Sequence, residues 1–260
     1  MTESVLFDVS EDGIATVTIN RPAAKNALDM ATASGLIDCW NEIEGSEAIR
    51  VAILTSADCG VFCAGMDLKE AARVKAEQGI DILQIFPEPQ NDTLRAMKKP
   101  VIAAMTGSLM AGGMMLSLNC DLRIGLAGSK AGITEVKVGR GSPWAAPALY
   151  MLPQPILMEI VLTGELMPIE KLHHYGFTNY VEETPDAVRT RAHQLASSII
   201  AGAPLSVKAA KGSVHATMNL GRAEGLKAAW ELHKEVYASE DAVEGPKAFS
   251  EKRKPEWKGR

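Results

Sequence analysis

Short apolar runs bounded by turn residues fill the first half of the chain. Residues 13–20 (GIATVTIN) alternate apolar and polar side chains, which is the period of a half-buried strand, and residues 5–9 predict a strand before them. Gly13 follows two acidic residues and predicts the hairpin turn between these strands. Continuous apolar runs at 50–55 (RVAILT) and 100–105 (PVIAAM) are typical of strands buried on both faces, and residues 121–126 predict the next strand.

Helical patterns separate these strands and then dominate the second half. We predict helices over residues 29–44, 67–78 and 114–119, a loop over 79–93, a glycine-containing turn over 106–113, and a short strand or loop over 131–139. The later helices are predicted at 157–163, 169–175, 185–201, 204–218 and 221–239. The alternation of strand, loop, helix and strand indicates an α/β protein with right-handed β-α-β units.

Composition and charge exclude two classes of partner. The 260 residues are 47% hydrophobic and 23% charged, with a net charge of -5 and a pI near 5.6. This composition is ordinary for a globular protein. The chain has no basic excess that would attract nucleic acid, and its sequence contains no apolar run of membrane-spanning length. The last stretch, residues 251–260, is locally basic and has two interpretations: a solvated tail or a phosphate-binding lip.

The four cysteines favour free thiols over a metal site. Cys59 and Cys63 have metal-like spacing, but no second pair follows and no histidine is near. No secretory segment is expected in the polar, mixed N-terminal residues, so we predict reduced thiols, a cytoplasmic location and no metal.

Two loops carry the chemical signal. Residues 62–68 (FCAGMDL) and 106–113 (TGSLMAGG) each follow a buried strand and lead into a helix. Such a junction exposes backbone N–H groups at the start of a helix, where they can bind an anion, and small residues let a ligand approach the backbone closely. Either loop taken alone is more typical of a simple tight turn than of a binding site.

Together with other segments, these loops resemble the crotonase (enoyl-CoA hydratase/isomerase) family over residues 4 to 258. The matching segments, in order, are NRP at 20–22, NAL at 26–28, FCAGMDLKE at 62–70, KPVIAA at 99–104, Gly107, GG at 112–113, CD at 120–121, VLTG at 161–164 and AFSEKRKP at 248–255.

The resemblance implies a fold, an assembly and a substrate. The expected fold is a crotonase-like spiral of ββα repeats over residues 1–200, followed by a helical region over 201–260 that serves oligomerisation and covers coenzyme A. The expected assembly is a homotrimer or homohexamer. The expected substrate is an acyl-CoA, with coenzyme A as part of the substrate and no separate cofactor.

The resemblance also implies site residues. The backbone N–H groups of Ala64 and Gly112 would form an oxyanion hole for the thioester carbonyl, and such preorganised donors are each worth about 3–4 kcal/mol in other enzymes. Lys25 would lie near the phosphates of coenzyme A. The remaining positions assigned to substrate or coenzyme A are Ala64, Met66, Asp67, Leu68, Gly112, Met115, Arg140 and Trp144.

One catalytic carboxylate is present and one is absent. Hydratases of this family use two glutamates; this chain has Glu135 at the second position and Met115 at the first. One carboxylate suffices to move a double bond, because it can take the α proton of a 3-enoyl thioester and return it at the γ carbon. We therefore prefer 3,2-enoyl-CoA isomerisation over hydration, with a raised pKa for Glu135 in an apolar pocket.

Several alternatives stay open at this point. Arg140, or Glu88 or Asp92 in the segment bordering the acyl pocket, could replace the missing acid. Glu135 could instead be a surface carboxylate at a strand end. The chain could also catalyse another reaction of the family, such as acyl-CoA hydrolysis or decarboxylation, or bind acyl-CoA without turnover.

Overall fold

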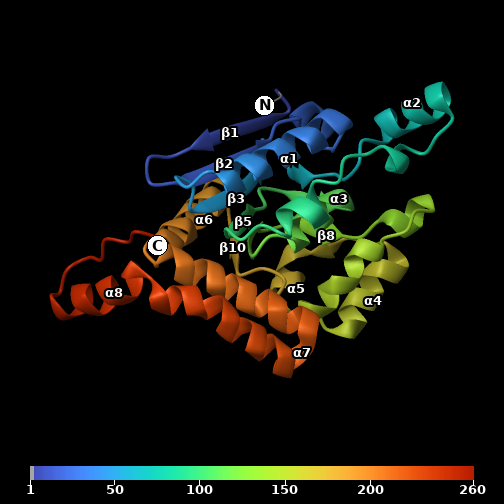
Figure 1. Cartoon of the computed structure of the whole chain (residues 1–260). Helices are drawn as coiled ribbons and strands as arrows, with labels where there is room; N and C mark the ends of the chain where they lie inside the picture. Colours follow the sequence, from blue (N-terminus) through green and yellow to red (C-terminus); the bar gives the residue numbers. More distant parts are fainter. Residues whose placement is uncertain (1–2) are drawn as a thin grey trace.

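The computed structural model describes residues 3–260, except for the side chains of Asn91 and Asp92. Ten strands form two sheets in the described residues (Figure 1). The larger sheet has the order β1 (Val5–Val9), β2 (Ile14–Ile19), β3 (Val51–Ser56), β5 (Val101–Ala104), β7 (Leu122–Leu126) and β10 (Tyr180–Glu182). The smaller has the order β4 (Val61–Cys63), β6 (Ser108–Met110), β8 (Lys130–Gly132) and β9 (Met167–Pro168).

Each turn of the fold contributes one strand to each sheet. β3 leads to β4 and then α2 (Leu68–Gln78), β5 leads to β6 and then α3 (Gly112–Leu118), and β7 leads to β8 and then the 3₁₀ helix η4 (Glu135–Val138). The pairs β4–β6 and β6–β8 are parallel, so the loops that follow these three strands leave the smaller sheet at the same edge. This is the predicted spiral of ββα repeats.

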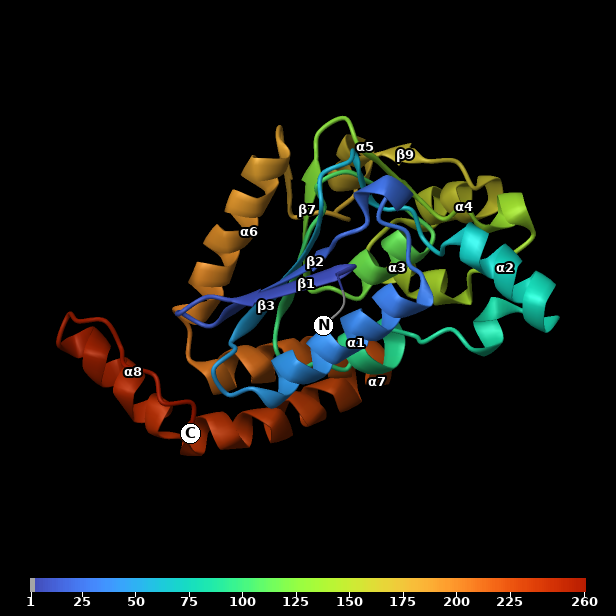
Figure 2. The ribbon, with the colours of Figure 1, turned by 90° about the horizontal axis from the view of Figure 1, so that it is seen from above.

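Two apolar layers hold the larger sheet. α1 (Met30–Gly45) packs on one face through Leu36, Trp40 and Ile43, and α6 (Pro185–Ile200) packs on the other through Val188 and Ala192. Figure 2 shows the two helices on opposite sides of the strands. β3 and β5 are buried along their whole length because both of their faces are covered, as the continuous runs predicted.

The second half of the chain is largely helical. Its helices are α4 (Gln154–Thr163), α5 (Ile169–His174), α6, α7 (Pro204–Ala238) and α8 (Glu240–Ser250), with the 3₁₀ helix η5 (Pro143–Tyr150) before them. Gly221 has φ of 74° and interrupts α7, so its two arms lie against each other: a Cβ placed on Gly225 would meet Thr217 Cα at 2.4 Å. The two predicted helices are therefore the arms of one hairpin.

Several local predictions were wrong. Residues 106–113 contain β6 rather than only a turn, and the predicted loop at 79–93 contains the 3₁₀ helix η2 (Ile82–Gln84) and a π-helical turn, η3 (Gln90–Leu94). β10 and α8 were not predicted. Strands of three residues carry too little periodicity to be read from sequence.

The C-terminal segment is docked rather than free. Asp241 in α8 is only 4% exposed, and its carboxylate accepts the N–H groups of Lys258 at 2.6 Å and Gly259 at 2.9 Å. The Trp257 indole N–H donates to the carbonyl of Ala201 at 2.8 Å. The interpretation of a solvated tail is therefore wrong for these residues. No described helix is both long and apolar enough to cross a lipid bilayer.

Candidate active site

The loop after β4 turns its backbone by means of a glycine. Gly65 has φ of 88°, and the carbonyl of Gly65 accepts the N–H of Leu28 at 2.7 Å, while the N–H of Asp67 donates to the Leu28 carbonyl at 2.9 Å. Leu28 and Met66 thus form a parallel β-bridge. Because the two peptide groups flanking Met66 face Leu28, the N–H of Met66 itself points the other way.

The loop after β6 ends at a helix start. Ala111 has φ of 51°, its N–H donates to the Gly132 carbonyl at 3.1 Å, and its carbonyl accepts the N–H of Met115 at 3.0 Å. Gly112 is the first residue of α3, where an N–H group has no intrahelical acceptor.

Glycines bring these two loops into direct contact. A Cβ on Gly112 would lie 3.3 Å from Gly65 Cα and 3.7 Å from the Gly65 carbonyl carbon, which is bonded to the Met66 nitrogen. A Cβ on Gly113 would lie 2.3 Å from the carbonyl oxygen of Cys63. Side chains at these positions would force the loops apart.

This geometry corrects the predicted pair of N–H donors. The N–H of Ala64 donates to the carbonyl of Lys25 at 3.2 Å and is therefore engaged. Within the part of the chain that the structure describes, the N–H groups of Met66 and Gly112 have no acceptor. The place of Ala64 in the loop predicts a free donor there, but in the folded chain the Ala64 N–H is paired and the opposite-facing N–H of Met66 is left free among the described residues.

Glu135 lies at the same edge of the smaller sheet. β8 pairs with β6 through Ala131 and Gly132, and Glu135 opens η4 three residues after β8 ends. It thus occupies a 3₁₀ helix, not the strand end of the alternative interpretation. Its Oε2 atom is buried and has no hydrogen-bond partner among the described residues.

Burial governs the protonation of this carboxyl group. Desolvation raises the pKa of Glu135 above its usual value, and the nearby backbone N–H groups of Glu135 and Thr134 and the Trp144 side chain oppose the rise without cancelling it. The predicted direction of this pKa shift is confirmed. A carboxylate of raised pKa with an unoccupied oxygen is suited to accept a proton from a ligand.

Met115 and Trp144 lie close to this arrangement in the fold. Met115 is half-buried in α3, three residues after Gly112 and therefore about one helical turn away. Trp144 is half-buried at the start of η5 and packs against the main core.

The other candidate acids and Arg140 are placed less favourably. Arg140 is exposed and forms an ion pair with Asp81, the N-cap of η2, so the structure places its charge in a surface pair. Glu88 already takes part in an interaction with another group of the protein, so it is not a free acid. The side chain of Asp92 lies outside the described residues.

The residues predicted for coenzyme A divide into two groups. Lys25 is exposed with φ of 54°, and Leu68 is 63% exposed at the start of α2, so both are accessible to a ligand. Asp67 instead caps α2 by accepting the N–H groups of Lys69 at 3.1 Å and Glu70 at 3.3 Å. Burial alone would raise the pKa of Asp67, but the hydrogen bond and charge of Arg21, with the two N–H groups of α2, hold it below its usual value.

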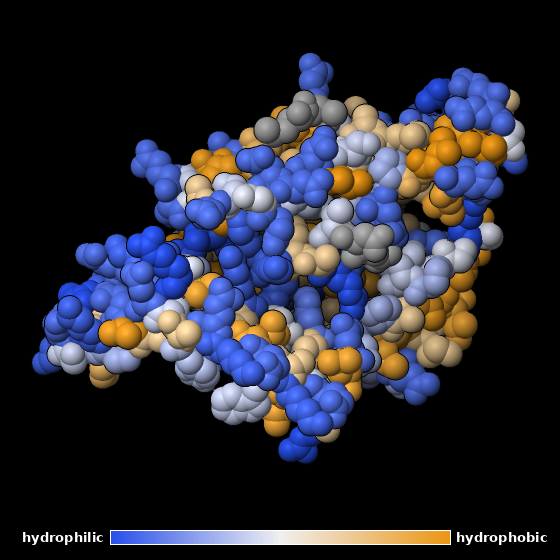
Figure 3. Space-filling model, in the orientation of Figure 1, coloured by the Kyte–Doolittle hydropathy of each residue, from blue (hydrophilic) through white to orange (hydrophobic). Residues whose placement is uncertain are grey.

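The surface near the site is apolar on two sides. Figure 3 shows hydrophobic residues gathered beside α2 and along α4. The exposed apolar side chains of these regions are Leu68, Leu83 and Ile85, and Leu149, Met158 and Leu162. An acyl chain would find apolar contacts there.

Neither metal nor thiol chemistry has support in the described residues. No group of three or more histidine, cysteine, aspartate and glutamate side chains there is arranged to hold a metal ion. Cys63, next to the loop, is fully buried, and burial raises the pKa of its thiol to about 12. A thiol of that pKa is a poor nucleophile.

Comparison with known proteins agrees with this arrangement. The family model for enoyl-CoA hydratase/isomerase matches residues 9–260. An (E)-benzylidenesuccinyl-CoA hydratase of Thauera aromatica is 35% identical over 98% of this chain and 99% of that protein. A carnitinyl-CoA dehydratase of Citrobacter koseri is 33% identical over 100% of both chains. The crystal structure of an enoyl-CoA hydratase from Mycobacterium tuberculosis H37Rv has a TM-score of 0.87 and 35% identity, covering 100% of both chains.

The fold and these comparisons define an enzyme of the crotonase superfamily that acts on acyl-CoA thioesters. Within it, the chain belongs to the enoyl-CoA hydratase/isomerase family.

Proposed function

We propose that the protein shifts the double bond of a 3-enoyl-CoA to the 2 position, with Glu135 as its acid–base group. Glu135 would take a proton from the α carbon, the carbonyl oxygen would gain negative charge as the dienolate forms, and Glu135 would return the proton at the γ carbon. One proton leaves and one returns, so no water and no cofactor are consumed.

The observation that carries this proposal is the buried, unpartnered Oε2 of Glu135 at the sheet edge where two unused N–H groups meet. The N–H groups of Met66 and Gly112 would hold the developing oxyanion, and such donors act strongly in a site that excludes water. Met115 leaves no second carboxylate on α3 to position a water molecule.

Hydration is the second candidate, and the names of relatives favour it. The relatives from Thauera aromatica and Citrobacter koseri are a hydratase and a dehydratase by name. Adding water to a 2-enoyl-CoA needs a water molecule activated at the β carbon. In this chain Glu135, or a group at neither of the two glutamate positions of the family, would have to activate it.

A paired assay separates the two. Purified protein is given a medium-chain 3-enoyl-CoA and, separately, a 2-enoyl-CoA of the same length. We expect the 3-enoyl ester to be converted to the 2-enoyl ester without formation of the 3-hydroxy ester. Rapid hydration of the 2-enoyl ester with no double-bond shift would overturn the isomerase proposal and favour the hydratase.

We also propose that the protein works as a homotrimer or homohexamer in the cytoplasm. Large apolar side chains on α7 and α8 are exposed in the single chain: Trp230 at 61%, Val243 at 70% and Phe249 at 88%. Self-association would bury them. The four cysteines are free, as expected in a reducing compartment. Light scattering on the purified protein tests the assembly.

A further inference from the structure

A cleft of about 510 Å³ lies outside the candidate active site. It is bounded by residues 95–98, which precede β5, and by both arms of the α7 hairpin. The chain runs from this cleft through β5 and β6 before it reaches Gly112. None of the described residues that line the cleft belongs to the loops that carry Met66 and Gly112.

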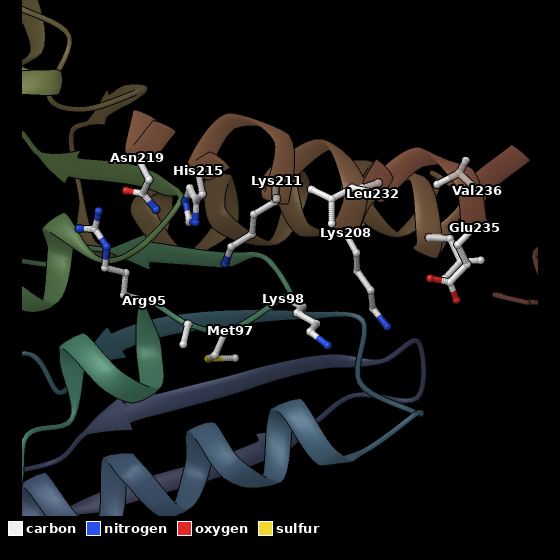
Figure 4. A pocket seen from close by; sticks show the side chains of 14 residues that line it. Arg95, Met97, Lys98, Lys208, Lys211, His215, Asn219, Leu232, Glu235 and Val236 are labelled. Atoms are coloured by element: carbon white, nitrogen blue, oxygen red, sulfur yellow. The ribbon is translucent and has the colours of Figure 1, made fainter. Parts of the chain in front are cut away.

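Unpaired cations line this cleft. Arg95, Lys98 and Lys208 have no ion-pair partner among the residues with described side chains. In Figure 4, Lys98 and Lys208 come from facing walls, with Arg95 near the opposite end from Glu235. Glu235 is the single carboxylate among the lining residues that are described.

The floor of the cleft is polar and fixed. Lys211 is largely buried and donates to the carboxylate of Asp121 at 2.8 Å and to the carbonyl of Lys99 at 2.9 Å. His215 lies 3.8 Å from the other oxygen of Asp121. Asn219, one turn further along α7, adds a neutral donor.

Neighbouring groups respond to this positive charge. The pKa of His215 lies below its usual value because of burial first, and Lys211 and Arg95 lower it further against the opposing effect of Asp121. The pKa of Lys99 is lowered by burial and then by Lys208. An anion in the cleft would relieve this repulsion.

The positive charge continues past Lys208. A second cleft of about 500 Å³ shares Lys208 and is also lined by Arg50, Lys258 and Arg260, together with Glu44 and Glu47. The excess is local, because the whole chain has a net charge of -5. Each cleft has the size of a small-molecule site.

We propose that the cleft between residues 95–98 and α7 binds a small molecule with clustered phosphates, such as a nucleoside diphosphate. Lys98 and Lys208 hold the phosphates from two sides, Arg95 provides a planar fork for a further phosphate oxygen, and the second cleft leaves room for the rest of the ligand. The site is separate from the acyl-CoA site and does not depend on which reaction the enzyme catalyses.

Calorimetric titration of the full chain with inorganic pyrophosphate and with ADP tests the proposal. We expect saturable binding that the double variant Lys98→Ala/Lys208→Ala weakens roughly 10-fold or more, since it removes two charge-assisted hydrogen bonds to phosphate. Lys98→Arg/Lys208→Arg keeps the charges and should retain binding.

Two controls make the result specific. Lys227→Ala/Lys234→Ala removes two exposed lysines of the same hairpin that pair with Glu224 and Glu231 instead of facing the cleft, and should bind like the wild type. Lys25→Ala alters the predicted coenzyme A site and should also leave binding intact. Absence of saturable binding, wild-type affinity in Lys98→Ala/Lys208→Ala, or loss of binding in Lys25→Ala would each overturn the proposal. All of these lysines except Lys208 are exposed, and melting curves verify that every variant folds.

Discussion

Replacing Glu135 by glutamine tests the proposed chemistry directly. The amide has nearly the shape of the carboxyl group but cannot accept the α proton, whereas the N–H groups of Met66 and Gly112 stay in place. General acid–base catalysis typically contributes roughly 10²–10⁴-fold, so we expect kcat to fall by that factor, or by about 2.7–5.5 kcal/mol of barrier. Affinity for the acyl-CoA should change little, because the thioester contacts remain.

The raised pKa of Glu135 adds a pH dependence with a defined sign. The base acts when ionised, so wild-type turnover should rise with pH through that raised pKa. For stability, the folded state binds the proton of Glu135 more tightly than the unfolded state does. The stabilisation from this proton is therefore complete below the unfolded pKa of about 4.3 and is lost as pH rises through the folded pKa.

The Glu135→Gln variant does not lose stability in this way, because glutamine has no proton to release in this pH range. Relative to the wild type, its free energy of unfolding should improve as pH rises above about 4.3 and then level off above the folded pKa of Glu135. Urea denaturation at pH 4 and pH 8 measures this difference. The variant should thus be at least as stable as the wild type at neutral pH while being nearly inactive.

The assay is turnover of a medium-chain 3-enoyl-CoA, with acyl-CoA binding measured separately by calorimetry. Glu77→Gln is the matched control, since Glu77 is an exposed carboxylate of α2 that pairs with Arg73, and it should keep wild-type activity. Full activity in Glu135→Gln would show that Glu135 is not the base. Inactivity accompanied by lost acyl-CoA binding would instead assign it a structural part in the site.

Three further substitutions probe the supporting structure. Gly65→Ala should cost about 1–3 kcal/mol of stability and lower kcat/KM, because its Cβ would lie 2.7 Å from Ala111 Cβ at φ of 88°; an unchanged melting temperature would contradict this. Asp241→Ala removes the acceptor of the Lys258 N–H, so residues 251–260 should be cleaved earlier in limited trypsin digestion; equal cleavage rates would refute the docking role. Met115→Glu should raise the ratio of hydration to isomerisation at some cost in stability, and an unchanged product ratio would contradict the proposed role of the missing carboxylate.

The coarse fold could be predicted because burial leaves a direct mark on the chain. Strands covered on both faces read as continuous apolar runs, and β3 and β5 fall within a residue of the predicted ends. Gly13 fixed the first hairpin, with φ of 86°. The three-residue strands β4 and β6 carry no such mark, because they are held by pairing with each other rather than by their own periodicity.

The sequence by itself determined the family, the presence of Glu135 and the absence of a carboxylate at Met115, because residue identities are independent of folding. Only the tertiary structure decided which N–H groups are free. The bridge between Leu28 and Met66 turns one N–H outward, while the carbonyl of Lys25 engages the N–H of Ala64. Hydrogen-bond direction depends on partners distant in sequence, and neither a motif nor its spacing encodes it.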